Sequence, residues 1–320
     1  MPNKRRIAFS TGDRLIEAVI LGKPYIANFQ GQTNLEKGYD YWQEISDIFR
    51  YGPPRYMVSA LCEHKGEIIR INPNGVFMIT DSVSYAQPLA EHPPERVELH
   101  CDAIVCPARH VRNLDKINLI LKTRDCVPLS GTDGDNFFVA HLSNQTLFGY
   151  GTASGKFNSD SFESSILHRL FSSFINPFHC SIAIGPSIGG TINQRSIDPT
   201  YQASEDDDCE CYGYTEKPDQ KDGSLLLECI SRQYPGIDLE QFYDNSPVPS
   251  KGKIVFHWSK LILALLKYHG VLEQRINPTY NFCTLCNHRK FYSQRYHNQH
   301  PEQNNESGYN LTIVSSRKAP

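Results

Sequence analysis

The amino-acid sequence predicts an α/β protein, and three observations lead to this fold class. Short runs rich in β-branched and aromatic residues recur along the chain and have the length of strands. Longer stretches between them carry apolar residues at helical spacing. The 320 residues also suffice for a large core, in one elaborate domain or two modest ones. No internal repeat is visible, so strands and helices alternate without a regular period.

Nine strands are predicted, each from a run of residues that favours extended backbone. The third and fourth strands flank a turn that contains His64, and the seventh ends on His141. Side chains that can bind a metal are therefore expected at strand ends. In chain order, the predicted strands lie at residues 7–9, 25–29, 56–61, 67–71, 102–105, 117–121, 137–141, 181–184 and 313–314.

Four helices are predicted from apolar residues spaced three and four apart. The first precedes a Gly-Pro-Pro breaker at 52–54, and the last ends at Gly270. The second is expected to cross the sheet. In chain order, the predicted helices lie at residues 40–49, 161–174, 224–232 and 259–269.

The stretch 201–251 differs from the rest of the chain in composition. It contains the acidic run 205–208, continues with Cys209 and Cys211, and ends in a segment rich in Pro, Ser and Lys. Acidic runs are usually solvated, and prolines interrupt regular structure. We therefore expect an acidic surface insertion and linker, with one helix near 224–232.

Composition favours a soluble cytoplasmic protein. A net charge of −3 does not favour nucleic acid or an anionic membrane as a partner. No apolar segment follows the basic residues 1–9, so no signal peptide is expected, and the apolar stretch 261–266 is too short to span a bilayer. The ten cysteines are too dilute for a disulfide scaffold. We expect reduced thiols, with Cys101, Cys180 and Cys229 packed as small hydrophobic residues.

Three short strings place metal-binding side chains next to predicted strands: C-E-H-K-G, T-R-D-C-V-P and V-A-H. Together they supply His64, Cys126 and His141. Three protein ligands leave the fourth position of a zinc ion open for water or substrate, whereas a structural zinc site usually has four protein ligands. The strings therefore predict a zinc site that performs chemistry.

Further polar residues surround these strings. Asp125 could orient a ligand histidine or a water molecule, or it could be a turn carboxylate bonded to nearby backbone. Arg124 and Arg295 could bind an anion, although each could equally be a surface residue. The glycine-rich turn at 185–190 follows a predicted strand and could present backbone amides to phosphate.

The order of motifs resembles that of the laccase-domain family, once called multicopper polyphenol oxidases and now understood as purine nucleoside phosphorylases. The family series reads D-A-x-V, T-A-D-C-x-P, A-H-A-G-W-R-G, I-G-P-x-I, C-T and F-x-S-Y-R-R. The resemblance runs from about residue 60 to the end, interrupted by the acidic stretch. The corresponding strings of this chain are D-A-I-V at 102–105, T-R-D-C-V-P at 123–128, V-A-H at 139–141, I-G-P-S-I-G at 184–189, C-T-L-C at 283–286 and F-Y-S-Q-R at 291–295.

This resemblance implies a fold and a function. The fold would be a layered α/β sandwich, with mixed β-sheets flanked by helices, in a single elaborate domain over 1–320. The activity would be zinc-dependent phosphorolysis of adenosine, inosine, guanosine and methylthioadenosine, with adenosine deamination as a further reaction. His64, Cys126 and His141 would bind the metal, and zinc is favoured over copper because the His-rich clusters of multicopper oxidases are absent.

In that reading Cys126, His141 and Asp125 would be the catalytic residues, with Arg124 and Arg295 facing the substrate or phosphate. The chain departs from the family in the loop that would meet the substrate. In place of G-W-R-G it has L-S-N-Q at residues 142–145. Arginine binds phosphate with a charged, bidentate guanidinium, and the amides of asparagine and glutamine do not supply that charge. The metal ligands thus match the family, while the substrate side is altered.

Two other functions are compatible with the same residues. The first is a cysteine hydrolase, with Cys126 as the nucleophile and His141 as its base. The second is a metal-binding member of the same fold that has lost catalysis, which the altered loop would explain. A coordinated thiolate is blunted as a nucleophile, so the metal content of the protein separates the first alternative from a zinc enzyme.

A separate zinc ribbon built from Cys283, Cys286 and His288 is disfavoured. Cys-x-x-Cys occurs only once in the chain, and Cys209 and Cys211 do not have the usual ribbon spacing. Cys283 is instead expected to be a packed residue at a strand end.

Overall fold

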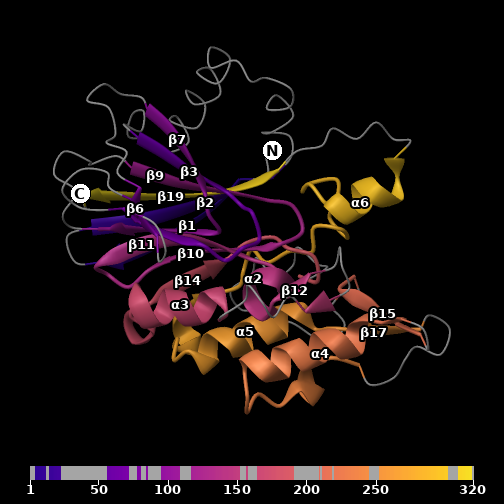
Figure 1. Ribbon diagram of the computed structural model, residues 1–320. Coiled ribbons are helices and arrows are strands. Elements are labelled where there is room, and N and C mark those ends of the chain that lie inside the picture. Colours follow the sequence, from indigo (N-terminus) through magenta and orange to yellow (C-terminus); the bar gives the residue numbers. More distant parts are fainter. Residues whose placement is uncertain are drawn as a thin grey trace.

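The structure, a computed structural model, describes residues 4–11, 14–22, 56–71, 78–80, 84–85, 95–108, 117–151, 156–157, 164–190, 209, 211–217, 220–244, 252–301 and 309–318. These residues form two large mixed β-sheets stacked face to face, and most of the helices lie below the second sheet (Figure 1). The prediction of a layered α/β sandwich is confirmed.

The first sheet has six strands and joins the two ends of the chain. β2 and β9 flank the last strand, β19, and both pair with it in antiparallel orientation. β3 pairs in parallel with β9 and β7. In sheet order the strands are β1 (Lys4–Thr11), β2 (Arg14–Leu21), β19 (Asn310–Lys318), β9 (Ile117–Thr123), β3 (Tyr56–Leu61) and β7 (Glu95–His100).

The second sheet has eight strands and carries the most buried part of the chain. Its central strands β10, β11 and β8 are buried along their whole length, as expected for strands covered on both faces. In sheet order the strands are β18 (Ile276–Asn277), β14 (Ser181–Ile184), β10 (Val127–Thr132), β11 (Asn136–Leu142), β8 (Ala103–Pro107), β4 (Ile68–Ile71), β5 (Met78–Thr80) and β6 (Ser84–Tyr85).

Helices and two small sheets complete the described fold. The α-helices are α2 (Asn144–Phe148), α3 (Ile166–Ser173), α4 (Asp222–Gln233), α5 (Trp258–Tyr268) and α6 (Gln294–Gln299). Short 3-10 helices are η2 (Pro177–His179), η5 (Leu239–Phe242) and η6 (Glu273–Arg275). The small sheets pair β12 (Tyr150–Gly151) with β13 (Lys156–Phe157), and β15 (Gly213–Lys217) with both β16 (Gln220–Lys221) and β17 (Lys253–Val255). None of the helices that the structure describes is long and apolar enough to cross a lipid bilayer.

Alternating side chains of one strand divide the core into two layers. In β11, Phe138 and Ala140 face the helices, whereas Phe137 and Val139 face the first sheet. This follows from the two-residue period of a strand, because successive side chains point to opposite faces of the sheet. Cys101, Cys180 and Cys229 lie buried in these layers, which confirms their predicted packing role.

Most predicted elements are present, with shifted ends. The helix predicted at 161–174 begins at Ile166, because the Ser165 side chain accepts a hydrogen bond from the Leu167 amide and caps the helix there. The helix predicted at 259–269 is α5, and Gly270 follows it with a positive φ of 90°. The strand predicted at 25–29 and the helix predicted at 40–49 lie outside the described residues.

The described part of the 201–251 stretch is built into the core. Tyr212 before β15, Leu226 and Ile230 on α4, and Tyr234 at its end are buried against the second sheet and α5. The helix predicted at 224–232 is α4. The acidic run 205–208 lies outside the described residues. This part of the chain is therefore more than a surface insertion, because its apolar side chains complete the helical layer.

Candidate metal centre

His64 lies in the turn that carries the chain from the first sheet to the second. Its φ is +60°, the only positive value among the described non-glycine residues, and such a backbone costs on the order of 1–3 kcal/mol unless its surroundings hold it. Asp102 holds it, because the His64 amide donates to Oδ1 at 3.1 Å and the Gly66 amide donates to Oδ2 at 2.8 Å. One carboxylate thus fixes the shape of the whole turn.

The same carboxylate orients the second histidine. His141 Nδ1 lies 2.9 Å from Asp102 Oδ1, and both side chains are almost completely buried. The His141 amide also donates to the Asp102 carbonyl at 2.7 Å. A carboxylate only accepts hydrogen bonds, so Nδ1 carries a proton and Nε2 is the nitrogen that could bind a metal in place of its own proton.

Strand register brings the thiol to the two histidines. Cys126 immediately precedes β10, whose first residues Val127 and Pro128 pair with Leu142 and His141 of β11. One ligand atom each from His64, Cys126 and His141 lies within 4.8 Å of the others. The ring centroids of the two histidines are 4.7 Å apart. The three side chains that the sequence singled out are therefore neighbours in space.

This set of donors fits a zinc ion. Zinc binds nitrogen at about 2.0–2.1 Å and thiolate sulfur at about 2.3 Å, so tetrahedral ligand atoms lie about 3.3–3.8 Å from one another. Ligand atoms that lie within 4.8 Å of one another reach these separations with small side-chain adjustments. Two imidazoles and one thiolate leave a position for water or substrate. Cys62, Asp102 and His141 also lie within 4.8 Å of one another, but this set includes the carboxylate that is already bonded to His141.

The surroundings of the cluster shift the pKa values of its two histidines in opposite directions. Burial, reinforced by His141, lowers the pKa of His64, so this imidazole is neutral near pH 7. Burial acts in the same direction on His141, but the Cys126 and Cys62 thiols and Asp102 outweigh it and raise the pKa of His141 well above its ordinary value. Hydrogen bonds from His141 and two backbone amides keep the pKa of Asp102 low despite its burial. A bound cation would take the place of the His141 proton.

Asp125 does not orient a histidine. Its Oδ1 accepts a hydrogen bond from Thr284 Oγ1 at 2.6 Å, and its Oδ2 accepts one from the Arg295 amide at 2.8 Å. The orienting carboxylate is Asp102, for which the sequence had predicted no role. The available signal was an aspartate directly before a buried strand in the D-A-I-V string. Asp125 instead ties the Cys126 turn to two distant segments of the carboxy-terminal part.

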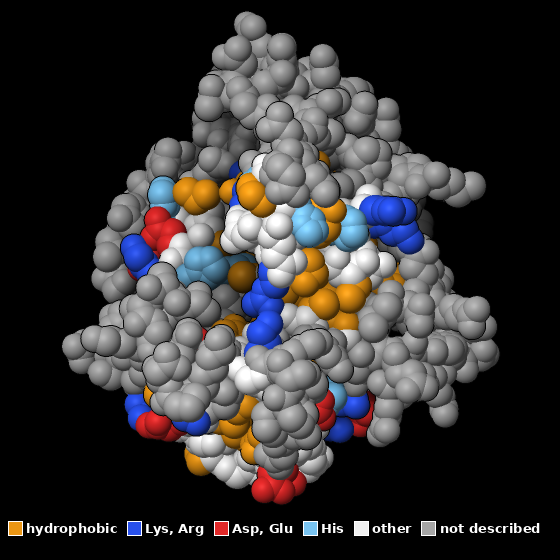
Figure 2. Space-filling view, turned by 90° about the vertical axis from the view of Figure 1, so that its right-hand side faces the viewer, with side chains coloured by type: hydrophobic (Ala, Val, Ile, Leu, Met, Phe, Trp, Pro, Cys, Tyr) orange, Lys and Arg blue, Asp and Glu red, His pale blue; other side chains and the backbone are white. Residues whose placement is uncertain are grey.

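The two candidate arginines have different surroundings. Arg124 packs over the Tyr309 ring, with its guanidinium carbon 4.7 Å from the ring centroid. Arg295 lies beside Asp125, and its guanidinium donates to the Cys211 carbonyl. Of the two, Arg295 is bound to the immediate neighbour of Cys126. Figure 2 shows Lys and Arg side chains crossing the face that carries α6, between histidines and hydrophobic side chains.

The loop that departs from the family pattern forms a short capped helix. α2 begins at Asn144, three residues after His141, and Ser143 and Thr146 cap it reciprocally. The Asn144 side chain donates to the Tyr214 hydroxyl and accepts from the Tyr212 hydroxyl. Burial raises the pKa of both tyrosines, so they remain neutral hydrogen-bonding groups. Two tyrosines of the 201–251 stretch therefore hold the residue that begins this helix.

The glycine-rich turn has a structural role. The amides of Gly185, Ser187 and Ile188 donate to the carbonyls of Pro128, Phe282 and Asp125, at 2.9, 3.0 and 2.9 Å. These amides are therefore not available to phosphate, and the expectation of a phosphate loop at 185–190 is wrong for them. The turn instead joins β10 to the segment before Cys283.

Comparisons with known proteins relate the chain to others by fold. No protein-family model matches the sequence, and no curated protein matches it. Solved structures do match over nearly the whole chain. Those of the hypothetical protein YfiH from Bacillus licheniformis and of YlmD from Geobacillus stearothermophilus have 18% and 16% identity, with TM-scores of 0.55 and 0.56. The first match covers 93% of this chain and 92% of the other, and the second covers 96% and 93%.

A third match is the protein NMB0706 from Neisseria meningitidis, which is assigned to the family DUF152. It is 12% identical, has a TM-score of 0.54, and covers 97% of this chain and 98% of the other. At these identities the likeness concerns the fold.

Proposed function

We propose that this protein is a zinc-dependent purine nucleoside phosphorylase that cleaves adenosine, inosine, guanosine or methylthioadenosine with phosphate. Adenosine deamination is proposed as a further activity of the same centre. The observation that carries the proposal is the convergence of His64, Cys126 and His141. Asp102 is hydrogen-bonded to the His64 amide and to the His141 ring. Three ligands with a carboxylate–histidine partner are typical of a zinc centre that keeps one position for chemistry.

The side chains of the centre have distinct roles in this proposal. Zinc bound here supplies a Lewis acid and a bound water with a pKa of about 7. Asp102 keeps the His141 proton on Nδ1 and fixes the His64 turn. Asp125 places the Arg295 backbone at the edge of the site. The Arg295 guanidinium has five N–H donors, and one of its nitrogens donates to the Cys211 carbonyl. Its other donors can bind a phosphate oxygen.

Phosphorolysis sets two demands on these residues. A phosphate oxygen forms a bond to the anomeric carbon while the bond from that carbon to the purine nitrogen breaks, and the departing purine takes up a proton. Arg295 meets the first demand by holding the anion. The second demand would be met by the chemistry that zinc supplies when His64, Cys126 and His141 hold it, and Asp102 keeps the buried His141 imidazole oriented for this.

A cysteine hydrolase is the second candidate, and one observation favours it. His141 lies between Cys126 and Asp102, in the order of a nucleophile, base and orienting carboxylate. His64 argues for the metal, because a triad would not require a second imidazole within 4.8 Å of the same thiol. Metal analysis separates the two readings, since a nucleophilic thiol must be free of metal.

Product analysis tests the proposed reaction. The purified full chain, with its zinc content measured, is incubated with each nucleoside and phosphate, and free base and ribose 1-phosphate are quantified. Equal amounts of both products are expected, with loss of turnover in His64→Ala and Cys126→Ser. Cys229→Ser, a buried cysteine on α4, serves as the matched control and should retain activity. Full zinc occupancy without turnover of any nucleoside would exclude the enzyme and leave a metal-binding protein.

A further inference from the structure

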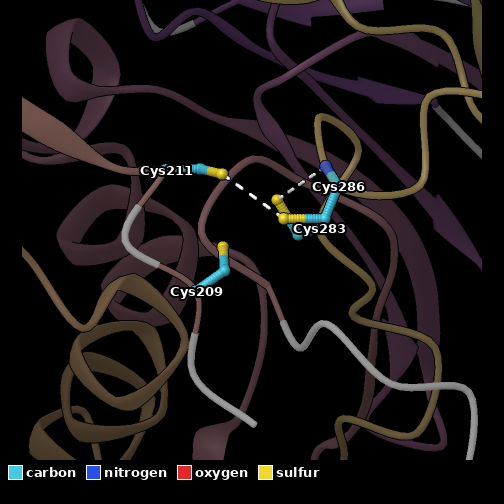
Figure 3. A group of neighbouring side chains, drawn as sticks. All are labelled: Cys209, Cys211, Cys283 and Cys286. Atoms are coloured by element: carbon cyan, nitrogen blue, oxygen red, sulfur yellow. Dashed lines mark hydrogen bonds between the residues drawn. The ribbon is translucent and has the colours of Figure 1, made fainter.

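Four cysteines outside the centre described above converge on one point. Cys209 and Cys211 precede β15, and Cys283 and Cys286 lie in the loop between β18 and α6. Figure 3 shows their side chains directed toward a common space from two separate backbone segments. All four sulfur atoms lie within 4.8 Å of one another, and Cys211 Sγ is 3.4 Å from Cys286 Sγ.

These distances fit a single tetrahedral ion. With metal–sulfur bonds of about 2.3 Å, the edge of a tetrahedron of four thiolates is about 3.8 Å. A cluster of several irons would hold its thiolates farther apart, because they bind different metal atoms. A disulfide would bring two sulfurs to about 2.05 Å, and all four thiols are free in the structure.

The local backbone supports four thiolates in this place. The Cys286 amide is directed at Cys283 Sγ at 3.5 Å, and a donor aimed at sulfur favours its ionised form. The Asn287 amide and side chain both donate to the Cys283 carbonyl, at 3.0 and 2.9 Å, and fix the turn. On the opposite side the Arg295 guanidinium binds the Cys211 carbonyl. Four thiolates and one divalent ion carry a net charge of about −2. The Arg295 guanidinium, bound to the Cys211 backbone, would partly offset this charge.

Burial of the four residues is graded. Cys283 and Cys209 are buried, Cys211 is half-buried, and Cys286 is exposed. The buried pair would be shielded from solvent, while the exposed residue gives the ion a path into the site. A soft divalent ion is the ligand that such a set selects, and zinc does so without redox chemistry.

We propose that Cys209, Cys211, Cys283 and Cys286 bind one structural zinc ion, separate from the His64–Cys126–His141 centre. Four protein ligands close the coordination sphere, so this ion holds the fold and performs no chemistry. A zinc ribbon built from Cys283, Cys286 and His288 was disfavoured from the sequence, and the proposed site does not use His288. His288 contacts the Leu285 carbonyl and stacks on Tyr296, and the missing ligands come from the 201–251 stretch.

The ion would join two segments that border the candidate active centre. Thr284, between two of its ligands, donates to Asp125 beside Cys126. Tyr212 follows Cys211 directly and binds Asn144, the first residue of α2. The structural ion would thus hold in place the two segments that contact Asp125 and Asn144, beside the proposed substrate site. This consequence for substrate binding depends on the proposed function, whereas the presence of the ion does not.

Metal content of matched variants tests the proposal without any assay of activity. The full chain is purified under reducing conditions and dialysed. Zinc and iron are then quantified by inductively coupled plasma mass spectrometry. The double variant His64→Ala/Cys126→Ser, which lacks the first centre, should retain about one zinc per chain. Adding Cys286→Ser, at the exposed ligand, should remove it, while adding Cys229→Ser should not.

A second measurement guards against failure of the Cys286→Ser chain to fold. Thiols of the folded His64→Ala/Cys126→Ser protein are titrated with a mercurial reagent, and released zinc is followed with a colorimetric chelator. Zinc should leave in step with about four reactive thiols. The proposal is overturned if this variant holds no zinc, if it holds iron instead, or if its mass shows that the four cysteines are paired as disulfides. None of these outcomes depends on phosphorylase activity.

Discussion

Asp102 is the residue on which the metal centre depends most. Its two oxygens receive hydrogen bonds from His141, His64 and Gly66, so it fixes both a ligand tautomer and a strained turn. The motif order of the sequence identified the three candidate ligands. Asp125 was given two possible roles, an orienting carboxylate or a turn carboxylate, because adjacency along the chain gives no information on which side a carboxylate faces.

We expect Asp102→Asn to weaken zinc binding at the Cys126 centre by about 10–100-fold, because the amide cannot hold the proton of His141 in the same way. Asp125→Asn is the comparison, since Asp125 binds Thr284 and Arg295 and no histidine. The effect is measured as the zinc that each variant retains at increasing chelator concentrations. Zinc of the Cys126 centre is identified as the portion that Cys126→Ser lacks. Equal losses in the two variants would contradict the role given to Asp102.

Gly66 lies in the His64 turn, where a larger side chain would strain the backbone and meet Arg169. Its φ is +76°, and a Cβ there would lie 2.5 Å from Arg169 Nη2, whose guanidinium binds the Gly66 carbonyl. Gly66→Ala should lower the free energy of unfolding by about 1–3 kcal/mol and loosen the His64 turn. Gly134→Ala is the matched control, because Gly134 has φ +98° but nothing within 4 Å of a new Cβ. Chemical denaturation compares them, and equal losses would show that the contact with Arg169 does not matter.

At the level of elements, the buried strands were predictable and their register was not. β8, β9, β11 and β14 were predicted within two residues of their ends, since they are continuous runs of strand-forming residues. β10 was missed because Pro128 and Gly131 interrupt it. Its pairing with β11 nevertheless brings Cys126 to His141. Such pairing joins residues distant in sequence and depends on tertiary packing, which local propensity does not encode.

A histidine cluster between the helices predicts acid sensitivity. His269 at the end of α5 contacts His168 and Phe171 of α3, as well as Tyr234 and Tyr268, and burial and His168 lower its pKa from 6.5 to about 4. The unfolded chain therefore takes up a proton at a higher pH than the folded chain. Stability should fall as the pH drops from 6.5 to 4, by about 1–3 kcal/mol after allowance for partial exposure.

Replacing this side chain tests the origin of the effect. His269→Phe should flatten the fall in unfolding free energy between pH 6.5 and 4, measured by denaturant titration at each pH. His179→Gln, at an exposed histidine of η2, provides the control. An unchanged slope in His269→Phe would place the acid-sensitive group elsewhere.

Across the whole molecule, two metal sites would lie on either side of a short chain of hydrogen bonds. Asp125 and Thr284 connect the His64–Cys126–His141 centre to the four-cysteine site. The sequence could not predict the second site, because its two cysteine pairs are separated by more than 70 positions and only folding of α4, α5 and β15 brings them together.

Zinc removal should therefore destabilise the entire fold. Each ion binds the folded chain and not the unfolded one, so stripping both should cost about 3–4 kcal/mol per site at zinc levels of 100–1,000 times the dissociation constant. Thermal unfolding with and without a chelator measures the loss. The chelator effect should be smaller in Cys286→Ser and in Cys126→Ser than in the unaltered chain. An identical melting temperature with and without chelator would contradict bound structural zinc.

Anomalous X-ray scattering from crystals of the full chain, recorded on both sides of the zinc absorption edge, tests the two proposed metal sites most directly. We expect one peak bound by His64 and His141 nitrogens and Cys126 sulfur, with a fourth ligand that is not protein. A second peak is predicted among Cys209, Cys211, Cys283 and Cys286. Absence of the first peak in crystals grown with zinc, with Cys126 free beside His141, would contradict the metal centre and favour the cysteine hydrolase.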